Sequence, residues 1–99
     1  MEYERKRDTV IARLTGELDH CSAPAVRREL DQLIGDPTVR NLVLDLKGMT
    51  FMDSSGIGVI LGRYRQMRAR GGRVAVRSMN PHVEKIFFLS GMNQVIDII

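Results

Sequence analysis

The sequence predicts a single α/β domain, in which helices pack on a mixed, mostly parallel β-sheet. Short apolar segments typical of strands alternate with longer amphipathic segments typical of helices, in the order ββαβαβαβ. Strands that are separated by helices pair in parallel through right-handed crossovers. The 99 residues, of which 43% are hydrophobic, suffice for one modest core and leave no room for a second domain.

The first two strands are expected to form an antiparallel hairpin. Residues 2–6 are polar on both sides, which suits a strand at the edge of the sheet. Arg7 and Asp8 provide a short turn before a more apolar segment, residues 9–14. The polar stretch 15–21 shows no regular period, and we expect it to be a loop.

A helix and a buried strand are expected next. The helix covers residues 24–34, because Pro24 is tolerated in a first helical turn and apolar residues then recur at helical spacing. Residues 35–37 end it. Residues 39–46 are apolar enough for a central strand that is covered on both faces, with Asp45 as the exception.

A loop from Lys47 to Ser55 is expected to lead into the longest helix, which runs to about Arg70. Asp53 or Ser54 is a good N-cap, because a short oxygen side chain can accept from the first free N–H groups of a helix.

The rest of the chain repeats the strand and helix alternation. Two glycines at 71–72 end the long helix. Residues 73–77 are a parallel strand, the amphipathic segment 83–89 is a helix that ends at Gly91, and residues 95–98 form a last short strand.

The longest helix has an unusual distribution of small residues. At about 100° per residue, one side carries the stripe expected to face the core: Ile57, Ile60, Leu61, Tyr64, Met67 and Arg68. The opposite side carries Ser55, Gly58, Gly62 and Gln66, with Val59 beside them. Each glycine inside a helix costs about 1 kcal/mol relative to alanine, which suggests that a partner approaches the backbone here. The alternative is that Gly56 and Gly58 only loosen a turn and Gly62 has no role.

Two loops are expected to meet at one edge of the sheet. In parallel sheets, sites form where loops leave the carboxyl ends of the strands. The loops that contain Asp19 and Ser55 both leave strands in this way, so these two residues are expected to be neighbours.

The chemistry of Ser55 can be ranked from its surroundings. A hydrolase nucleophile elbow needs glycine on both sides of the serine, and Asp53 and Ile57 occupy those places. The lysine and glycines of a Walker phosphate loop are absent, as are the acidic pair and lysine of a phospho-aspartate receiver. Phosphorylation of Ser55 has a physical basis, because a helix N-terminus accommodates negative charge. We therefore expect no enzymatic activity, no cofactor and no metal.

Composition limits the remaining classes of function. A single cysteine, Cys21, excludes an internal disulfide, and with two histidines it makes a structural zinc site unlikely on composition. No apolar stretch is long enough to span a bilayer and the N-terminus has no apolar leader, so a cytoplasmic protein is expected. The net charge of +3 comes largely from arginines that suit the end of the long helix or, as an alternative, a nucleic-acid interface: Arg63, Arg65, Arg68, Arg70 and Arg73.

Two segments carry a family resemblance. Residues 51–64 (FMDSSGIGVILGRY) and 14–20 (LTGELDH), with residues 89–91 (LSG) near the end, closely resemble the anti-sigma factor antagonists of the STAS domain family. The likeness extends over nearly the whole chain, which is accordingly identified as one STAS domain, 1–99. It implies that Ser55 is phosphorylated and that Asp19 helps to bind the anti-sigma factor.

The resemblance also implies a mechanism and a set of partners. The unmodified protein would bind an anti-sigma factor that is also a serine kinase and so free a sigma factor, in transcription regulation during sporulation. The kinase would use ATP and magnesium to phosphorylate Ser55, and a serine phosphatase would reverse the change. The protein itself is expected to be a monomer that binds neither nucleic acid nor membrane. The expected partner-binding residues are Asp19, Asp53, Ser54, Gly56, Gly58, Val59 and Gly62. A different class, a STAS module that senses a nucleotide or another anion directly, is the alternative.

The sequence departs from the family pattern in two places. Family members usually continue past the last strand into another helix, whereas this sequence ends at Ile99, so one face of the sheet is expected to be exposed. Close relatives also tend to have histidine and threonine where Cys21 and Ser22 stand here, which changes the contacts of the first loop.

Overall fold

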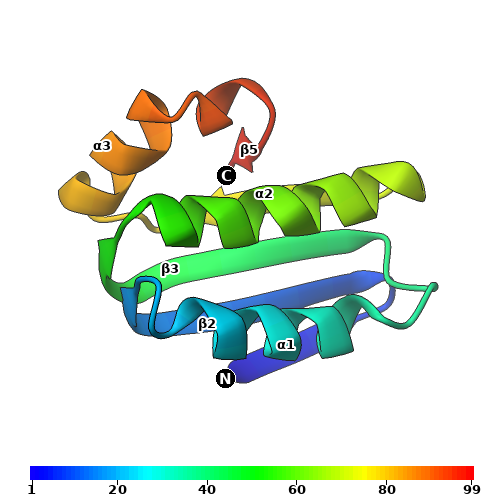
Figure 1. Ribbon diagram of the computed structural model, residues 1–99. Helices are drawn as coiled ribbons and strands as arrows, with labels where there is room; N and C mark the ends of the chain where they lie inside the picture. The colour runs from blue at the N-terminus through cyan, green and yellow to red at the C-terminus, as the bar shows by residue number, and fades with distance from the viewer.

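Five strands form one sheet in the order β1-β2-β3-β4-β5, in which only the β1–β2 pair is antiparallel. The computed structural model describes residues 1–99 (Figure 1). The expected order ββαβαβαβ is confirmed. The elements are β1 (Glu2–Lys6), β2 (Thr9–Leu18), α1 (Ala23–Ile34), β3 (Asn41–Met52), α2 (Ser54–Ala69), β4 (Arg73–Arg77), α3 (Pro81–Leu89), the short 3-10 helix η1 (Met92–Gln94) and β5 (Asp97–Ile98).

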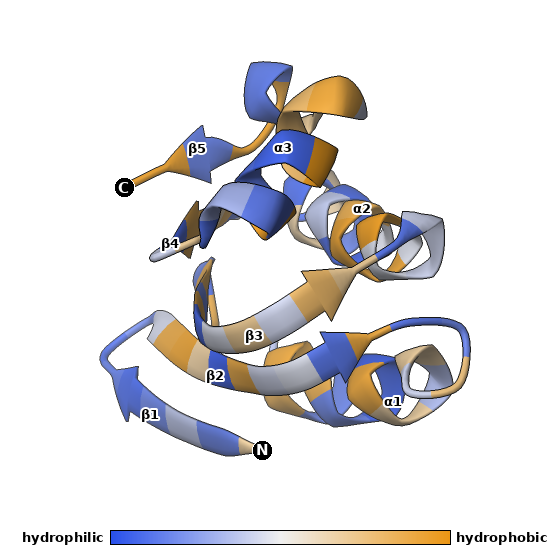
Figure 2. Ribbon diagram, turned by 90° about the vertical axis from the view of Figure 1, so that its left-hand side faces the viewer, coloured by the Kyte–Doolittle hydropathy of each residue, from blue (hydrophilic) through white to orange (hydrophobic).

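The two longer helices, α1 and α2, lie on the same side of the sheet (Figure 2). Leu42, Leu44 and Leu46 of β3 are fully buried, whereas Asn41 and Val43, which alternate with them, are partly exposed. The expectation that this strand is covered on both faces is therefore wrong. Its apolar run reflects one deeply buried face, while the other face stays partly exposed at Asn41 and Val43. No helix of the structure has the length and apolar character needed to cross a membrane.

The central strands are longer than expected. β2 and β3 stay paired as far as Leu18 and Met52, so most of the predicted loops 15–21 and 47–55 are strand. Two register shifts, between Arg13 and Thr15 and between Gly16 and Glu17, interrupt the pairing. Such bulges break the two-residue alternation by which a strand is recognised in a sequence.

Asp45, the polar exception within β3, is paired with a cation on the next strand. Its register partner on β4 is Arg77, whose Nη2 lies 3.2 Å from Asp45 Oδ2. The backbone N–H of Lys47 donates to Asp45 Oδ1 at 3.0 Å. Burial by itself raises the pKa of Asp45, but the hydrogen bond from Lys47 and the Arg77 guanidinium more than offset it, and the pKa is lowered. The carboxylate is therefore ionised and satisfied.

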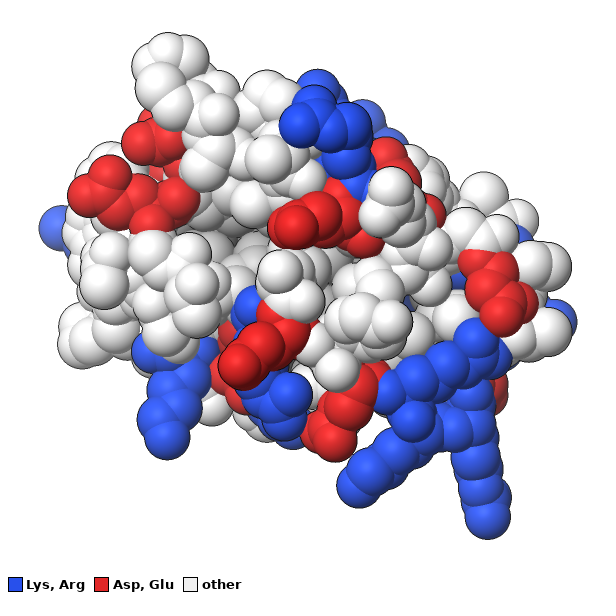
Figure 3. Space-filling view, turned by 90° about the horizontal axis from the view of Figure 1, so that it is seen from below, with Lys and Arg blue, Asp and Glu red and all other residues white.

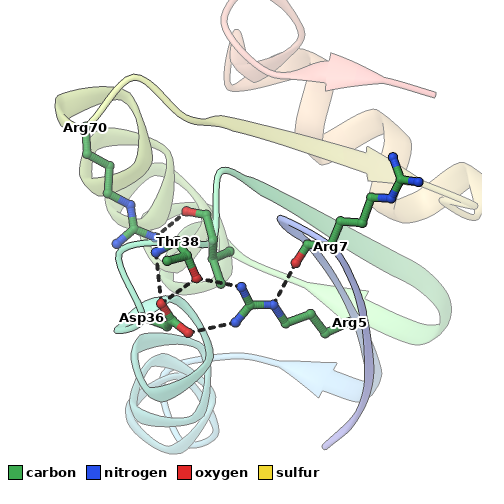
Figure 4. A network of polar contacts seen from close by, with 6 residues as sticks. Arg5, Arg7, Asp36, Thr38 and Arg70 are labelled. Carbon is green, nitrogen blue, oxygen red and sulfur yellow. Dashed lines mark hydrogen bonds and ion pairs between the residues drawn. The ribbon is translucent and has the colours of Figure 1, made fainter.

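Besides its pairing with β2, the polar edge strand β1 is linked by Arg5 to the segment that follows α1 (Figure 4). Arg5 Nη1 lies 2.8 Å from Asp36 Oδ2, and Arg5 Nη2 donates to Thr38 Oγ1 at 2.7 Å. The Thr38 hydroxyl and backbone N–H both donate to Asp36 Oδ1. The hydrogen bond from the Thr38 side chain, followed by that from Arg5, holds the pKa of Asp36 well below its usual range.

This network predicts a pH-dependent contribution to stability. Because the pKa of Asp36 is depressed in the folded state, its contribution is complete above the unfolded-state pKa of about 3.9 and is lost as the pH falls towards the folded-state pKa. Asp36→Asn should lower the urea midpoint at pH 7, and the difference from the wild type should shrink between pH 5 and pH 3. In an Arg5→Gln background the same substitution should have a smaller effect. An equal difference at pH 7 and pH 3 would contradict the prediction.

Candidate functional site

Helix α2 begins at the carboxyl end of β3, with Asp53 as its N-cap. Asp53 has extended backbone angles, and its Oδ1 accepts from the N–H of Ser55 at 2.8 Å. Its carbonyl oxygen accepts from the N–H of Ile57 at 3.2 Å. Of the two caps that the sequence allows, the structure uses Asp53, while Ser54 is the exposed first residue of the helix. Ser55 is partly exposed in the first turn.

The start of α2 is seated on the end of β2. Leu18 is the register partner of Met52, and the N–H of Asp53 donates to the carbonyl of Leu18 at 3.3 Å. A Cβ atom on Gly56 would lie 2.6 Å from Met52 Cγ and 2.9 Å from Leu18 Cγ. Only glycine allows this approach without displacement of its neighbours. Gly56, expected in the partner-binding set, is buried and lets α2 pack against the sheet.

Asp19 organises the loop between β2 and α1. Its Oδ1 accepts from the N–H groups of Cys21 at 2.9 Å and Ser22 at 3.0 Å, and its carbonyl accepts from the N–H of Ala23 at 2.8 Å. The Ser22 hydroxyl in turn donates to the Glu17 carbonyl at 2.7 Å. The backbone hydrogen bond from Ser22 is the main reason that the pKa of Asp19 lies below its usual value. Cys21 is exposed.

A groove lies between the starts of α1 and α2, which are side by side at one end of the sheet (Figure 1). The α2 side of the groove includes Ser55, as expected of a loop that meets the first loop at the sheet edge. His20, next to Asp19, lines it from the other loop. The complete lining is His20, Ala23, Pro24, Arg27, Ser55, Gly58 and Val59. The sequence reasoning missed Arg27, although its place one turn into a helix that starts at the same sheet edge was a usable signal.

The exposed flank of α2 is partly as expected. A Cβ atom on Gly58 or Gly62 would meet nothing within 4 Å, so the backbone is bare at both positions. Gln66 is exposed. Val59 does lie beside this flank and lines the groove with Ser55 and Gly58, but it is only 4% exposed. Arg68, expected to face the core, is exposed.

The packing of Arg63 against α1 explains why this side of α2 is more buried than the helical wheel predicts. It is 5% exposed, and its Nε lies 3.1 Å from Asp31 Oδ1 on α1. Gln66 Nε2 donates to the same oxygen at 3.2 Å. Burial lowers the pKa of Arg63, the charge of Arg27 acts in the same direction, and Asp31 opposes them. Because α1 packs beside α2, the buried sector of α2 extends to Val59 and Arg63 on the side that faces α1.

The arginines near the end of α2 are not a continuous basic surface. Arg63 is buried, and Arg70 is partly buried, with its Nη2 donating to the Val39 carbonyl at 3.1 Å. Arg65, Arg68 and Arg73 remain exposed. Figure 3 shows a different face, that of α1 and β1, and there too acidic side chains lie between basic ones. These positions therefore give little support to the nucleic-acid alternative.

The model of the STAS domain matches residues 1–99. The chain belongs to the STAS domain family. It is 43% identical over 98 residues to an anti-sigma F factor antagonist from Paenibacillus polymyxa, a match that covers 99% of this chain and 84% of the relative.

Two solved structures of SpoIIAA, which belongs to the same family, resemble this STAS domain. Unphosphorylated SpoIIAA, described as an anti-sigma factor antagonist, superposes with a TM-score of 0.85 at 34% identity, covering 99% of this chain and 86% of that one. The phosphorylated form of SpoIIAA, a Bacillus cell fate determinant, gives a TM-score of 0.76 at 33% identity, covering 99% and 89%. The relative is thus known in a phosphorylated and an unphosphorylated state with this fold, and the sequence resemblance to the family is confirmed.

The glycines of α2 should respond to substitution in opposite directions. Gly56→Ala places a methyl group against Leu18 and Met52 and should lower the free energy of unfolding by about 1–3 kcal/mol. Gly58→Ala, in open space, should raise it by up to about 1 kcal/mol because alanine is the better helix former. Urea unfolding of both variants measures the difference. Equal effects of the two substitutions would show that Gly56 is not seated as described.

Proposed function

We propose that this STAS domain is an anti-sigma factor antagonist that is switched off by phosphorylation of Ser55. In its unphosphorylated form it binds an anti-sigma factor that is also a serine kinase, and the sigma factor is released. The observation that carries the proposal is the position of Ser55. Its partly exposed side chain lies in the first turn of α2, beside the bare backbone of Gly58 and Gly62.

Phosphorylation requires a reachable hydroxyl and a place for the new charge. The kinase would transfer the γ-phosphoryl group of magnesium-bound ATP to Ser55 Oγ. The P–Oγ bond forms, the bond to ADP breaks and the hydroxyl proton is released. The product carries about −1.5 to −2 charges at neutral pH. The N-terminus of a helix stabilises negative charge through its dipole and free N–H groups, so the fold can accept the modification.

The same charge is suited to abolish binding without unfolding. A partner that lies against Gly58 and Gly62 would meet the phosphate at the rim of the contact and would have to desolvate it. Burial of an unpaired charge at an interface is costly. Asp53, Ser54 and Asp19 surround this contact. Asp19 contributes by fixing the loop whose next residue, His20, lines the groove. Removal of the phosphate by a serine phosphatase would restore the binding form.

Two properties of the relatives support the proposal, namely that they are anti-sigma factor antagonists and that one of them is known in phosphorylated and unphosphorylated forms. The similarity to an anti-sigma F factor antagonist and to SpoIIAA in both phosphorylation states covers almost the whole of this chain. A role in transcription regulation during sporulation follows from the same relatives. A monomeric, cytoplasmic protein without enzymatic activity agrees with this function.

Phosphate transfer tests the site directly. A purified anti-sigma F factor kinase with ATP and magnesium should add one phosphate to the wild-type protein, and mass spectrometry should locate it on Ser55. Ser55→Ala should accept none. Ser54→Ala, which removes the neighbouring hydroxyl, is the matched control and should still be modified. Phosphate on any other residue would contradict the proposal.

The bare flank of α2 makes a separate prediction about binding. Gly58→Leu should leave the circular dichroism spectrum close to that of the wild type and should not lower the unfolding midpoint, because the side chain enters open space and leucine is a better helix former than glycine. Its affinity for the kinase should fall at least about tenfold, equivalent to about 1.4 kcal/mol, since the backbone can no longer be approached. Ala69→Leu, at an exposed position at the far end of α2, should bind like the wild type. Unchanged affinity of Gly58→Leu would exclude this flank as the contact.

A further inference from the structure

The groove beside Ser55 is lined by basic side chains from outside α2. Arg27 projects from α1 and His20 from the preceding loop, and no acidic side chain lines the same groove. Arg27 is exposed and forms no ion pair, in contrast to four other arginines of the chain that do, which are Arg5, Arg13, Arg63 and Arg77.

Positive charge is also in excess deeper between α1 and α2. Arg63, one turn beyond Val59 on α2, has a side chain that is 6% exposed, and its Nη1 atom has no hydrogen-bond partner. Its contact with Asp31 is an ion pair that Asp31 shares with Gln66. Arg27 is close enough to Arg63 for its charge to disfavour the protonated form of Arg63. Two guanidinium groups thus lie close enough to repel each other, and only Arg63 has a carboxylate partner, an arrangement that an added anion would relieve.

The acidic groups nearby are already committed to backbone donors. Asp53 Oδ1 accepts from the N–H of Ser55, and Asp19 Oδ1 accepts from the N–H groups of Cys21 and Ser22. Neither carboxylate forms an ion pair with Arg27, whereas His20 lies close enough to Asp19 to help lower the pKa of that carboxyl. In the unmodified protein, the Arg27 guanidinium at the groove therefore has no anionic partner.

We propose that Arg27, together with His20, binds the phosphate group of phosphorylated Ser55 and links α1 to α2 in the modified state. The proposal rests on the proposed phosphorylation of Ser55 and adds the residues that receive the phosphate. A guanidinium can donate two parallel hydrogen bonds to phosphate oxygens, and charge-assisted bonds of this kind are stronger than neutral ones. Phosphorylation then changes the surface in two ways, because it adds negative charge beside Gly58 and also occupies Arg27.

The test does not require the kinase. Phosphoserine is introduced at position 55 during translation, and the phosphorus NMR signal of the protein is followed between pH 4 and pH 9. A phosphoserine has a second pKa of about 6, and a nearby guanidinium lowers it by favouring the dianion. Besides Arg27, the charged or titratable groups near the phosphate are His20 and Asp19, in the loop between β2 and α1, together with Asp53, the N-cap of α2, and Arg63 within α2.

Arg27→Gln should raise this second pKa by roughly 0.5. Arg27→Lys keeps the positive charge, so the pKa should stay close to that of the wild type. Arg28→Gln is the matched control, because Arg28 is the exposed neighbour on α1 and does not line the groove. It should leave the pKa unchanged. His20→Gln tests the contribution of the other side chain that lines the groove and should also raise the pKa. The effect of Arg27→Gln should also fall in 1 M salt.

Equal pKa values for Arg27→Gln and Arg28→Gln would overturn the proposal. The result is independent of the proposed function. If Arg27→Gln shifts the phosphate pKa but no kinase modifies the protein, the phosphate site stands and the proposed function is contradicted. If a kinase modifies Ser55 efficiently but Arg27→Gln has no effect, the proposed function stands and the phosphate site is contradicted.

Discussion

The pairing of Leu18 with Met52 at the carboxyl ends of β2 and β3 is the constraint on which the candidate site depends. It continues the two central strands past two bulges, so that the loop to α1 and the start of α2 leave the sheet together. Gly56 completes the arrangement, because a larger residue would push α2 away from Leu18. Because the start of α2 packs here, Ser55 lines a groove together with residues about thirty positions earlier in the chain.

The site separates groups that the fold uses from groups that it leaves free. Asp53 and Asp19 satisfy backbone donors at the starts of α2 and α1, so their carboxylates are fixed in position for local structural reasons. Other groups make no such structural contacts: the Ser55 side chain, the backbone at Gly58 and Gly62, and the Arg27 guanidinium. A modification or a partner can therefore engage them while the core is undisturbed. The glycines carry the main cost, about 1 kcal/mol each in helix stability.

The contact between α1 and α2 continues beyond the groove. Arg63 and Gln66 of α2 both contact Asp31 of α1, and Val59 is buried on the same side. Because of these contacts, the buried side of α2 is wider than a helical wheel suggests, since it faces both the sheet and α1. It also brings Arg27 to the groove, where a phosphate on Ser55 would lie between the two helices.

The sequence by itself determined the order of the elements, a cap at Asp53 or Ser54, the polar edge strand and the small-residue flank at Gly58 and Gly62, because each depends on residues close together in the chain. The motif around Ser55 also identified the family and the residue expected to be modified. Only the tertiary structure decided what depends on distant neighbours. The bulges of β3 against β2 hid the full length of the central strands from a periodicity argument. The burial of Val59 and Arg63, the close seat of Gly56 and the meeting of Arg27 with Ser55 follow from the packing of α1 and the sheet against α2, which no local pattern encodes.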